Sequence, residues 1–314
     1  MNKAFSKDNY CFVISLGPKH TRYCRCLLSS LRYFGMNALI YILNDGNTDV
    51  SQLAKIKGVT IIDVNDINKQ HDINLIGLLS KLNFYFFPRL GYDYDYYVYF
   101  DADSIVLENF EDKFIGQEFD FGILHGSVVD VSTDSNRKMF TKYAYDPAHD
   151  AEKLNSNERY YFSSGHFIIN KSILDIDHLR RHRHDMFSSF KNESSFKFFG
   201  DQGYLNYYVN ELHLEKRKIL LIDIGLYGKD AGMFDYKDVI SKKYNGKSFI
   251  HYTGPSRYPF LFQHNYAPLL RFYTKLFYRY ISNAPVLART RDTIKETNAK
   301  DIYRLFRYQL FSRK

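Results

Sequence analysis

The sequence predicts an α/β protein with a mostly parallel sheet flanked by helices. Apolar runs alternate with segments of helical spacing through the first hundred residues, a pattern typical of a chain that winds strand, helix, strand. Two of these runs, Tyr10–Leu16 and Tyr96–Phe100, are apolar at nearly every position, as expected of buried strands. In sheets of this kind, ligands bind at the carboxyl ends of the strands.

The expected elements follow one another without an internal repeat. Strand patterns occur at residues 10–16, 38–43, 59–64 and 96–100, and helical patterns at 21–34, 50–57 and 75–87. Gly35 is a typical helix stop, and Asn44-Asp45-Gly46 is a turn sequence. Residues 127–160 are polar and irregular, which indicates a loop or an insertion. Further strand patterns follow at 161–170, 219–224 and 249–251, with a helical pattern at 204–210.

Composition bounds the class of protein. With 314 residues, 45% of them hydrophobic and 25% charged, the chain can bury a large core and is not disordered as a whole. Residues 1–10 lack the apolar run of a signal peptide, and no stretch is long and apolar enough to span a membrane. Cys11, Cys24 and Cys26 form neither a disulfide framework nor a four-ligand zinc site. We therefore expect a cytoplasmic protein with reduced thiols.

The net charge lies at one end of the chain. Lys and Arg number 43 against 35 Asp and Glu, a net charge of +8. Residues 262–314 hold eleven basic and three acidic residues and so carry the whole excess. A nucleic-acid-binding domain would spread its positive charge over the fold, so we do not expect nucleic acid as a partner. We divide the chain into a domain at 1–262 and a basic, aromatic tail at 263–314.

The tail also has apolar residues at spacings of three and four, the pattern of an amphipathic helix. They are Leu269, Leu270, Phe272, Tyr273, Leu276, Phe277, Tyr280, Ile281, Ile302, Tyr303, Leu305, Phe306, Leu310 and Phe311. A basic helix of this kind is typical of an anchor at a membrane surface, which would place the protein on the inner face of a membrane. The alternative is a terminal helix that packs on the protein's own core. We favour the membrane surface.

The most informative segment is YYVYFDADSIVLENF. Asp101 and Asp103 flank Ala102 directly after a buried strand, where one divalent cation can bind both carboxylates. Oxygen ligands suit Mg²⁺ or Mn²⁺. A calcium loop also begins with two such aspartates, but residues 105–107 are apolar where that loop needs a ligand and a glycine. The alternative is a solvated turn after a strand.

Three later segments favour a ligand site over a turn. They are FSSG at 162–165, GDQG at 200–203 and FIHYTGPSRYPF at 249–260. His251 offers an imidazole as a third ligand for Mn²⁺, and Arg257 offers a fork of donors for phosphate. Together with the acidic pair, these segments predict one site for a metal-bound nucleotide diphosphate.

At these residues the chain resembles a retaining glycosyltransferase of family 8, which has the GT-A fold and includes glycogenins and bacterial lipopolysaccharide galactosyl- and glucosyltransferases. The resemblance is carried by Ser80-Lys81-Leu82, VYFDADSIVLENFEDKF, FSSG, GDQGYLN and IHYTGPSRYPF, in the family's order over residues 10–260. It implies a UDP-sugar donor, UDP-glucose or UDP-galactose, and a hexose transferred with retention to a hydroxyl of a glycan or a lipid-linked acceptor.

The resemblance also implies a role for each matching residue. Asp101, Asp103 and His251 bind Mn²⁺ or Mg²⁺, and Asp201 and Gln202 are the catalytic residues under the anomeric carbon. The residues implied to bind the donor are Leu16, Gly17 and Tyr23 at uracil and ribose, Lys81, Ala102 and Asp103 at the ribose and sugar, Ser164 and Gly165 at the sugar, and Gly254 and Arg257 at the diphosphate.

The chain departs from the family pattern at several positions. At the N-terminus, Gly17-Pro18-Lys19-His20 lacks the family's usual small polar pair. Ser163 stands for its asparagine, Arg257 for its lysine with Tyr258 inserted after it, and Phe260 for its tryptophan. His166 stands for an apolar residue, and we expect it to face the acceptor.

Other interpretations remain beside this one. A catalytically inactive GT-A-like fold could bind a sugar or a partner, and an NDP-sugar nucleotidyltransferase could use the same aspartates. Asp201 could form a covalent intermediate, or the acceptor could attack on the face that UDP leaves. The histidines of HLRRHRHD, at 178, 182 and 184, could bind zinc, but we expect an exposed helix face. The tyrosines of GYDYDYYVY could accept glucose, but we expect that segment to enter the core.

Overall fold

The computed structural model of the chain describes residues 3–17, 20–46, 48–149, 156–188, 200–228, 234–252 and 267–281. Its centre is a seven-stranded sheet in the order β10-β6-β9-β4-β1-β2-β3. The strands are β1 (Tyr10–Leu16), β2 (Ile40–Asn44), β3 (Val59–Asp63), β4 (Tyr96–Asp101), β6 (Phe121–Ile123), β9 (His166–Asn170) and β10 (Ile219–Leu221). β9 runs antiparallel to β4 and β6, and the other neighbours are parallel. The sheet is therefore mostly parallel, as predicted.

Two smaller sheets complete the strands. β11 (Gly225–Tyr227), β12 (Phe249–His251) and β5 (Ser104–Val106) form a three-stranded sheet, and β7 (Gly126–Asp130) pairs antiparallel with β8 (Glu158–Phe162). β5 begins three residues after β4 ends, so the three-stranded sheet starts at the carboxyl edge of the central one.

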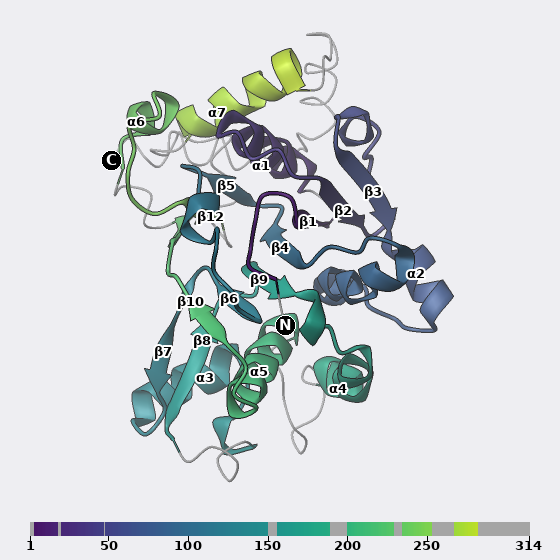
Figure 1. Cartoon of the computed structure of the whole chain (residues 1–314), viewed down its shortest axis with the longest axis vertical. Coiled ribbons are helices and arrows are strands. Elements are labelled where there is room, and N and C mark those ends of the chain that lie inside the picture. Colours follow the sequence, from purple (N-terminus) through teal and green to yellow (C-terminus); the bar gives the residue numbers. More distant parts are fainter. Residues whose placement is uncertain are drawn as a thin grey trace, which may run out of the picture.

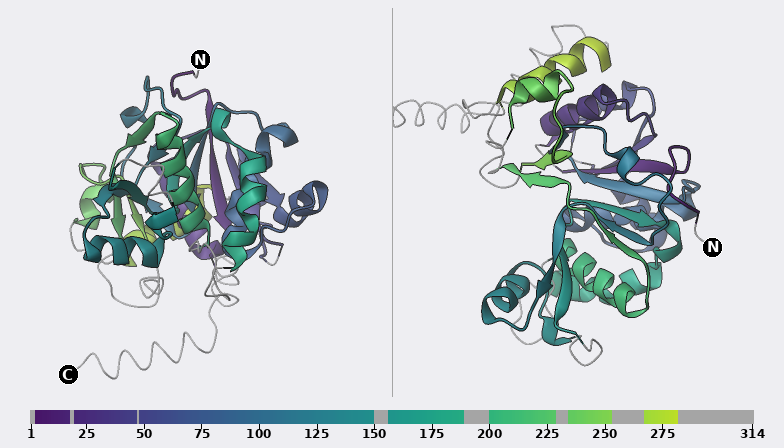
Figure 2. Two further views of the ribbon diagram at one scale, coloured as in Figure 1. Left: turned by 90° about the horizontal axis from the view of Figure 1, so that it is seen from below. Right: turned by 60° about the vertical axis from the view of Figure 1, so that its left-hand side comes forward.

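Helices cover both faces of the central sheet (Figure 1). On one side lie α1 (Thr21–Tyr33), α6 (Tyr236–Ile240) and α7 (Ala267–Leu276), followed by the π-helical turn η8 (Phe277–Ile281). On the other lie α2 (Val64–His71), the 3₁₀ segment η2 (Gly77–Leu90), α4 (Ile176–Ser188) and α5 (Gly200–Leu214). α3 (Asp134–Tyr143) packs beside β7 and β8 at the end of the molecule that also holds α5 (Figure 2). Short 3₁₀ turns lie at Leu53–Lys55, Glu111–Lys113, Pro147–His149 and Lys171–Ile173.

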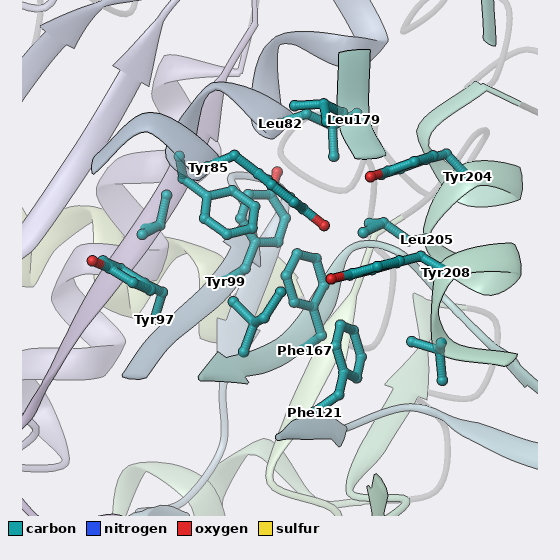
Figure 3. Close-up of a cluster of buried hydrophobic side chains, with 14 of the residues drawn as sticks. Leu82, Tyr85, Tyr97, Tyr99, Phe121, Phe167, Leu179, Tyr204, Leu205 and Tyr208 are labelled. Atoms are coloured by element: carbon teal, nitrogen blue, oxygen red, sulfur yellow. The ribbon is translucent and has the colours of Figure 1, made fainter. Parts of the chain in front are cut away.

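The two faces explain why β1 and β4 are apolar throughout. Successive side chains of a strand point to opposite faces. Cys11 and Val13 of β1 pack toward η2, while Phe12 and Ile14 pack toward α1. On the η2 side the core is rich in aromatic rings: Tyr99 stacks on Phe167, with ring centroids 4.9 Å apart (Figure 3).

The structure confirms the fold class and the strands at 10–16, 38–43, 59–64, 96–100 and 249–251 to within two residues. Several expectations were wrong in detail. The strand expected at 219–224 ends at Leu221. The helix expected at 50–57 is only a 3₁₀ turn, and the one at 75–87 is the 3₁₀ segment η2. Val64 begins α2 instead of ending a strand, because the side chain of Asp63 accepts a hydrogen bond from the backbone N–H of Asn65 and caps the helix.

The segment 127–160 is not a loop. It holds β7, α3 and the start of β8, and Val129, Val131 and Phe140 belong to the buried core on the η2 side. The strand expected at 161–170 is two strands, β8 and β9, separated by the FSSG turn. Polar residues on the exposed face of β7 and α3 hid these elements in the sequence.

The first part of the basic tail packs on the domain. Leu269, Leu270 and Tyr273 of α7 are fully buried against α1, and the thiol of Cys26 lies 3.6 Å from the carbonyl of Leu270. For these side chains the membrane interpretation was wrong, and the terminal-helix alternative holds. The side chains of Tyr280 and Ile281, and residues 282–314 of the proposed anchor, lie outside what the structure describes. Within the described part of the chain, no helix is both long and apolar enough to cross a membrane.

Candidate active site

The predicted acidic pair lies at the carboxyl end of β4. Asp101 is opposite Ser15 on β1, and its backbone N–H donates to the carbonyl of Gly165 at 2.8 Å. The chain then turns through Ala102 and Asp103 into β5, where Ser104 pairs with His251 on β12. Because of this pairing, a residue 148 positions away in sequence meets the acidic pair. β4, β5 and β12 meet near the centre of the molecule (Figure 1).

Asp101, Asp103 and His251 form a group of potential metal ligands. One ligand atom from each lies within 4.8 Å of the others. His251 Nε2 is 3.2 Å from Asp103 Oδ1 and 3.7 Å from Asp101 Oδ2. The side chain of Asp101 is a quarter exposed, whereas those of Asp103 and His251 are buried. The group is therefore open to solvent through Asp101.

This group fits a divalent cation. Two carboxylates and one imidazole are ligands that Mn²⁺ accepts. Space is left for them because residue 165 is a glycine: a Cβ there would come within 2.8 Å of Asp101 Oδ2 and 3.0 Å of His251 Cε1. A side chain at that position would push into the ligand atoms.

Lys81 links the acidic pair to the helix α5. Its ammonium lies 3.1 Å from Asp101 Oδ1 and 2.8 Å from Asp201 Oδ2. Burial lowers the pKa of Lys81, but the carboxylates of Asp101 and Asp201 outweigh burial and leave that pKa above its usual value. Lys81 is therefore a fixed positive charge between the two carboxylates.

Ser164 and Gln202 complete this network. The hydroxyl of Ser164 donates to Asp201 Oδ2 at 2.5 Å, and its backbone N–H donates to Gln202 Oε1 at 2.7 Å. The amide of Gln202 also donates to the carbonyl of Phe162. Both ends of the Gln202 side chain thus hold the FSSG turn.

α5 presents amides at a spacing of four residues along one face. Asn206 and Asn210 each exchange two hydrogen bonds with the backbone of β8, at Phe162 and Tyr160, with distances of 3.0 Å. Gln202 begins the same row. This row satisfies backbone groups on one edge of β8 and fixes the position of Asp201 relative to FSSG.

His166 does not face an acceptor, which corrects our expectation. It is fully buried, its Nε2 lies 2.6 Å from the hydroxyl of Ser104, and its ring stacks on Phe249. The edge of His251 lies against it, with ring centroids 4.6 Å apart. Burial lowers the pKa of His166 well below its usual value, so the ring is neutral. It packs behind His251 and supports that ligand.

The remaining predicted donor contacts are placed as follows. Leu16 and Gly17 directly follow Ser15, the partner of Asp101 in the sheet. Ala102 is buried in the core on the α1 side. Tyr23 is buried in α1, 6.2 Å from the ring of Tyr252, the residue after His251. Gly254 and Arg257 lie outside the described residues.

Sequence reasoning missed two residues at this edge. The hydroxyl of Tyr99 donates to Asp101 Oδ1 at 2.7 Å. His125 follows Leu124, which is the first residue after β6. Like Asp101 at the end of β4, His125 is a polar residue directly after an apolar run, and this pattern was the available signal. By contrast, the exposed face expected for the HLRRHRHD helix was wrong for His178, which is buried and bonded to Glu211 and Tyr204. His184 lies among residues whose side chains are not described.

Comparison with known proteins shows which fold this chain has. No protein-family model matches the chain, and no curated protein matches it in sequence. Solved structures do match. The bifunctional glycosyltransferase WbbM has a TM-score of 0.54 at 15% identity, covering 87% of this chain and 51% of its own. An active-site mutant of LgtC has a TM-score of 0.50 at 14% identity, covering 84% of this chain and 94% of its own.

The fold is that of the GT-A glycosyltransferases. A third match, GlyE of Streptococcus pneumoniae TIGR4, has a TM-score of 0.48 at 18% identity, covering 87% of this chain and 64% of its own. This chain spans about half the length of WbbM and less than two thirds of GlyE. In the GT-A fold of this chain, the acidic pair, His251 and Asp201 stand at the carboxyl edge of the central sheet.

Proposed function

We propose that this chain is a metal-dependent glycosyltransferase that moves a hexose from UDP-glucose or UDP-galactose to a hydroxyl of a glycan or lipid-linked acceptor, with retention. One observation carries the proposal: Asp101, Asp103 and His251 meet at the carboxyl edge of the sheet, with Asp201 tied to Asp101 through Lys81. WbbM, which shares the fold, is described as a glycosyltransferase, and this supports the class of reaction.

Each side chain has a task in this reaction. Asp101, Asp103 and His251 would hold Mn²⁺ or Mg²⁺, which when bound neutralises charge on a departing diphosphate. Lys81 supplies a permanent positive charge beside Asp101. Ser164, fixed by Asp201 and Gln202, holds the backbone of Gly165 close to the ligands, so that the donor sugar meets a rigid turn. Preorganised groups of this kind stabilise charge as it develops.

Asp201 is suited to face the anomeric carbon. Its Oδ2 lies 2.8 Å from the Lys81 ammonium and accepts a hydrogen bond from the Ser164 hydroxyl, and these two contacts fix the carboxylate in place. Retention follows from attack on the face that UDP leaves or from a covalent intermediate on Asp201. The anomeric configuration of the product, measured by NMR during the first turnovers, tests retention itself.

Two alternatives are less well supported. In a catalytically inactive sugar-binding or partner-binding module the chain would not need to keep Asp101, Asp103, His251 and Asp201 together, as it does. A nucleotidyltransferase would need a glycine-rich, basic loop after β1, and Gly17-Pro18-Lys19-His20 is a poor version of one.

UDP release from a panel of UDP-sugars, with Mn²⁺ or with EDTA, tests the proposal. Wild type and Asp103→Ala are compared with the control Asp95→Ala. Asp95 lies directly before the opposite end of β4 and forms ion pairs with the surface residues Lys3 and Lys171. We expect release from one UDP-sugar that EDTA and Asp103→Ala abolish and Asp95→Ala preserves.

Two results would overturn the proposal. Wild-type release that persists in EDTA would remove the metal from it. No release from any UDP-sugar, together with no thermal shift from UDP and Mn²⁺, would replace it with the inactive binding module.

The membrane surface is part of the proposal only through residues 282–314. Deleting the tail from 263 would also remove α7, whose side chains belong to the core, so the deletion must begin at 282. We expect that deletion to abolish binding to anionic liposomes and to leave UDP release intact. Equal liposome binding by both proteins would exclude the membrane role.

A further inference from the structure

A second polar cluster lies at the same edge of the sheet, two strands from Asp101. β6 and β4 are both antiparallel to β9, and Ile123 and Tyr99 both face Phe167 across it. His125 lies two residues beyond Ile123, in the bend that follows β6, as Asp101 lies two beyond Tyr99. Two strand spacings, about 10 Å, separate β6 from β4. The carbonyl of His125 also accepts a hydrogen bond from Ser163 at 3.0 Å, in the FSSG turn.

The imidazole of His125 is held in one orientation. Its Nδ1 lies 3.2 Å from Asp223 Oδ1, and Lys247 lies 2.5 Å from Asp223 Oδ2. An ionised carboxylate only accepts hydrogen bonds, so Nδ1 carries the hydrogen and Nε2 keeps a lone pair. Burial lowers the pKa of His125, partly offset by Asp223, which leaves it below the usual value and the ring neutral near pH 7.

Gly225 leaves room for this ring. A Cβ at Gly225 would lie 2.5 Å from His125 Nδ1 and 2.6 Å from its Cγ. The ring therefore sits directly against the backbone of β11. The carboxylate of Asp223 on one side and the backbone of β11 on another therefore fix the imidazole of His125 in place.

Tyr227 connects this cluster to the metal ligands. It pairs with His251 in the parallel register of β11 and β12, and residues paired in this way point to the same face of a sheet. The edge of its ring meets the ring of His125, with centroids 4.3 Å apart. His125 and Tyr227 are both partly exposed. An amphipathic ring and a hydrogen-bond acceptor thus stand side by side, next to His251.

We propose that His125 and Tyr227 form the acceptor subsite of this enzyme and that it takes a neutral sugar ring. The inference rests on the proposed function. The apolar face of the sugar packs on Tyr227, and one of its hydroxyls donates to His125 Nε2. Asp223 is a positioning residue, because it acts through the orientation of His125.

The chemistry of the cluster selects a neutral sugar over a phosphorylated one. Lys247 is paired with Asp223, so its charge is already compensated. His125 is neutral and presents a lone pair, which repels an anion. A hydroxyl group provides the donor that Nε2 needs, whereas a phosphate at neutral pH provides mainly acceptors.

The test is acceptor-stimulated UDP release from the preferred donor. The probes are the methyl α- and β-glucopyranosides and galactopyranosides, with glucose 6-phosphate as the charged counterpart. We expect a neutral glycoside to accelerate release by wild type. His125→Phe keeps an aromatic ring but loses Nε2, and we expect the acceptor KM to rise about tenfold, as for one lost hydrogen bond. The donor KM should change less than twofold.

His178→Phe is the matched control. His178 is also a buried histidine bonded to a carboxylate, Glu211, but it packs between α4 and α5, remote from the edge. We expect its acceptor KM to match wild type. For the positioning role, Asp223→Asn keeps an oxygen for Nδ1 and should retain a near-normal acceptor KM, whereas Asp223→Ala should behave like His125→Phe.

Each of the remaining outcomes would overturn one part of the proposal. An unchanged acceptor KM in His125→Phe excludes the subsite. Stronger acceleration by glucose 6-phosphate than by every neutral glycoside excludes a neutral sugar, and so does donor hydrolysis that no glycoside accelerates; the proposed function stands in all of these cases. No UDP release by wild type from any donor overturns the proposed function, and this inference with it.

Discussion

The two ends of β4 carry the same kinds of residue in different surroundings. Before its amino end, Asp95 pairs with Lys171 and Lys3, whose side chains are 38% and 75% exposed. At its carboxyl end, Asp101 pairs with Lys81, whose side chain is 8% exposed and also meets Asp201. At the amino end the side chain of Asp95 is only 12% exposed, but its lysine partners are solvated and water can take their place. The carboxyl-end network is desolvated, and its members depend on one another.

The comparison teaches where function can lie. Burial raises the pKa of Asp95, but hydrogen bonds from Lys171 and Lys3 outweigh burial and leave it below its usual value. Such surface pairs contribute little to stability. Buried charges are retained only where they are paired, and they are costly to keep. The buried charges at the carboxyl edge, where ligands of parallel sheets bind, therefore support the ligand site that we propose.

The largest effect should come from removing the lysine at each end. Lys81→Met leaves Asp101 and Asp201 without their shared ammonium, and we expect a loss of about 3–5 kcal/mol in unfolding free energy and of roughly a hundredfold or more in UDP release. Lys171→Met should cost at most about 1 kcal/mol and leave UDP release unchanged. Urea unfolding and UDP release, measured on both variants, check this. Equal losses in the two variants would erase the distinction between the ends.

The next largest effect should be on Mn²⁺ binding, which should depend on Asp103 and not on Asp95. A ligand that binds only the folded state stabilises it, by about 2.7 kcal/mol at a hundred times its Kd. We expect Mn²⁺ to raise the melting temperature of wild type and of Asp95→Ala, and not that of Asp103→Ala, because Asp103 belongs to the group of potential ligands around His251 and Asp95 does not. The readout is thermal unfolding across a Mn²⁺ series. A shift in Asp103→Ala equal to that of wild type would place the cation elsewhere.

Alanine substitutions at two glycines should separate activity from stability, because one should reduce UDP release and the other should reduce the free energy of unfolding. Gly165→Ala places a Cβ 2.8 Å from Asp101 Oδ2, so we expect UDP release to fall about tenfold, the equivalent of roughly 1.4 kcal/mol in the barrier. Gly91, in the turn before β4, has φ +85° and open space around it. Gly91→Ala should lower stability by about 1 kcal/mol through backbone strain and leave UDP release unchanged. Loss of activity in Gly91→Ala alone would contradict our placement of the site.

The two ends also show what the sequence can predict. Asp101 and Asp103 were found because they end an apolar run, and that run is apolar because β4 is covered on both faces. His251 was proposed as a third ligand because it ends a later strand. The roles of Asp201 and Lys81 were found through a resemblance, since these residues come from segments far apart that only strand pairing and helix packing bring together. The neutral, buried role of His166 could not be predicted, because it depends on Phe249 and Ser104 from other strands.

Other parts were missed for physical reasons as well. α3 and β7 have polar outer faces, and each has a single buried residue, Phe140 in α3 and Val129 in β7, which leaves little periodicity in either segment. The apolar face of α7 could bind a membrane or pack in a protein core. The structure shows that it packs against α1, which the sequence of α7 alone does not reveal. The cluster of His125, Asp223 and Tyr227 joins three short segments, none of which carries a motif.

The smallest effect concerns the charge of Asp95 and its dependence on pH. Because the folded-state pKa of Asp95 lies below that of the unfolded chain, about 3.9, its ion pairs stabilise the protein fully above that value and cease to do so as pH falls through the folded pKa. Asp95→Asn should therefore be less stable than wild type at pH 7, by less than about 1 kcal/mol because both lysines are exposed. The gap should narrow from about pH 5 downward. Urea unfolding of both proteins at pH 7, 5, 4 and 3.5 measures it, and a gap independent of pH would mean that packing of the Asp95 side chain, not its charge, is what the amino end of β4 requires.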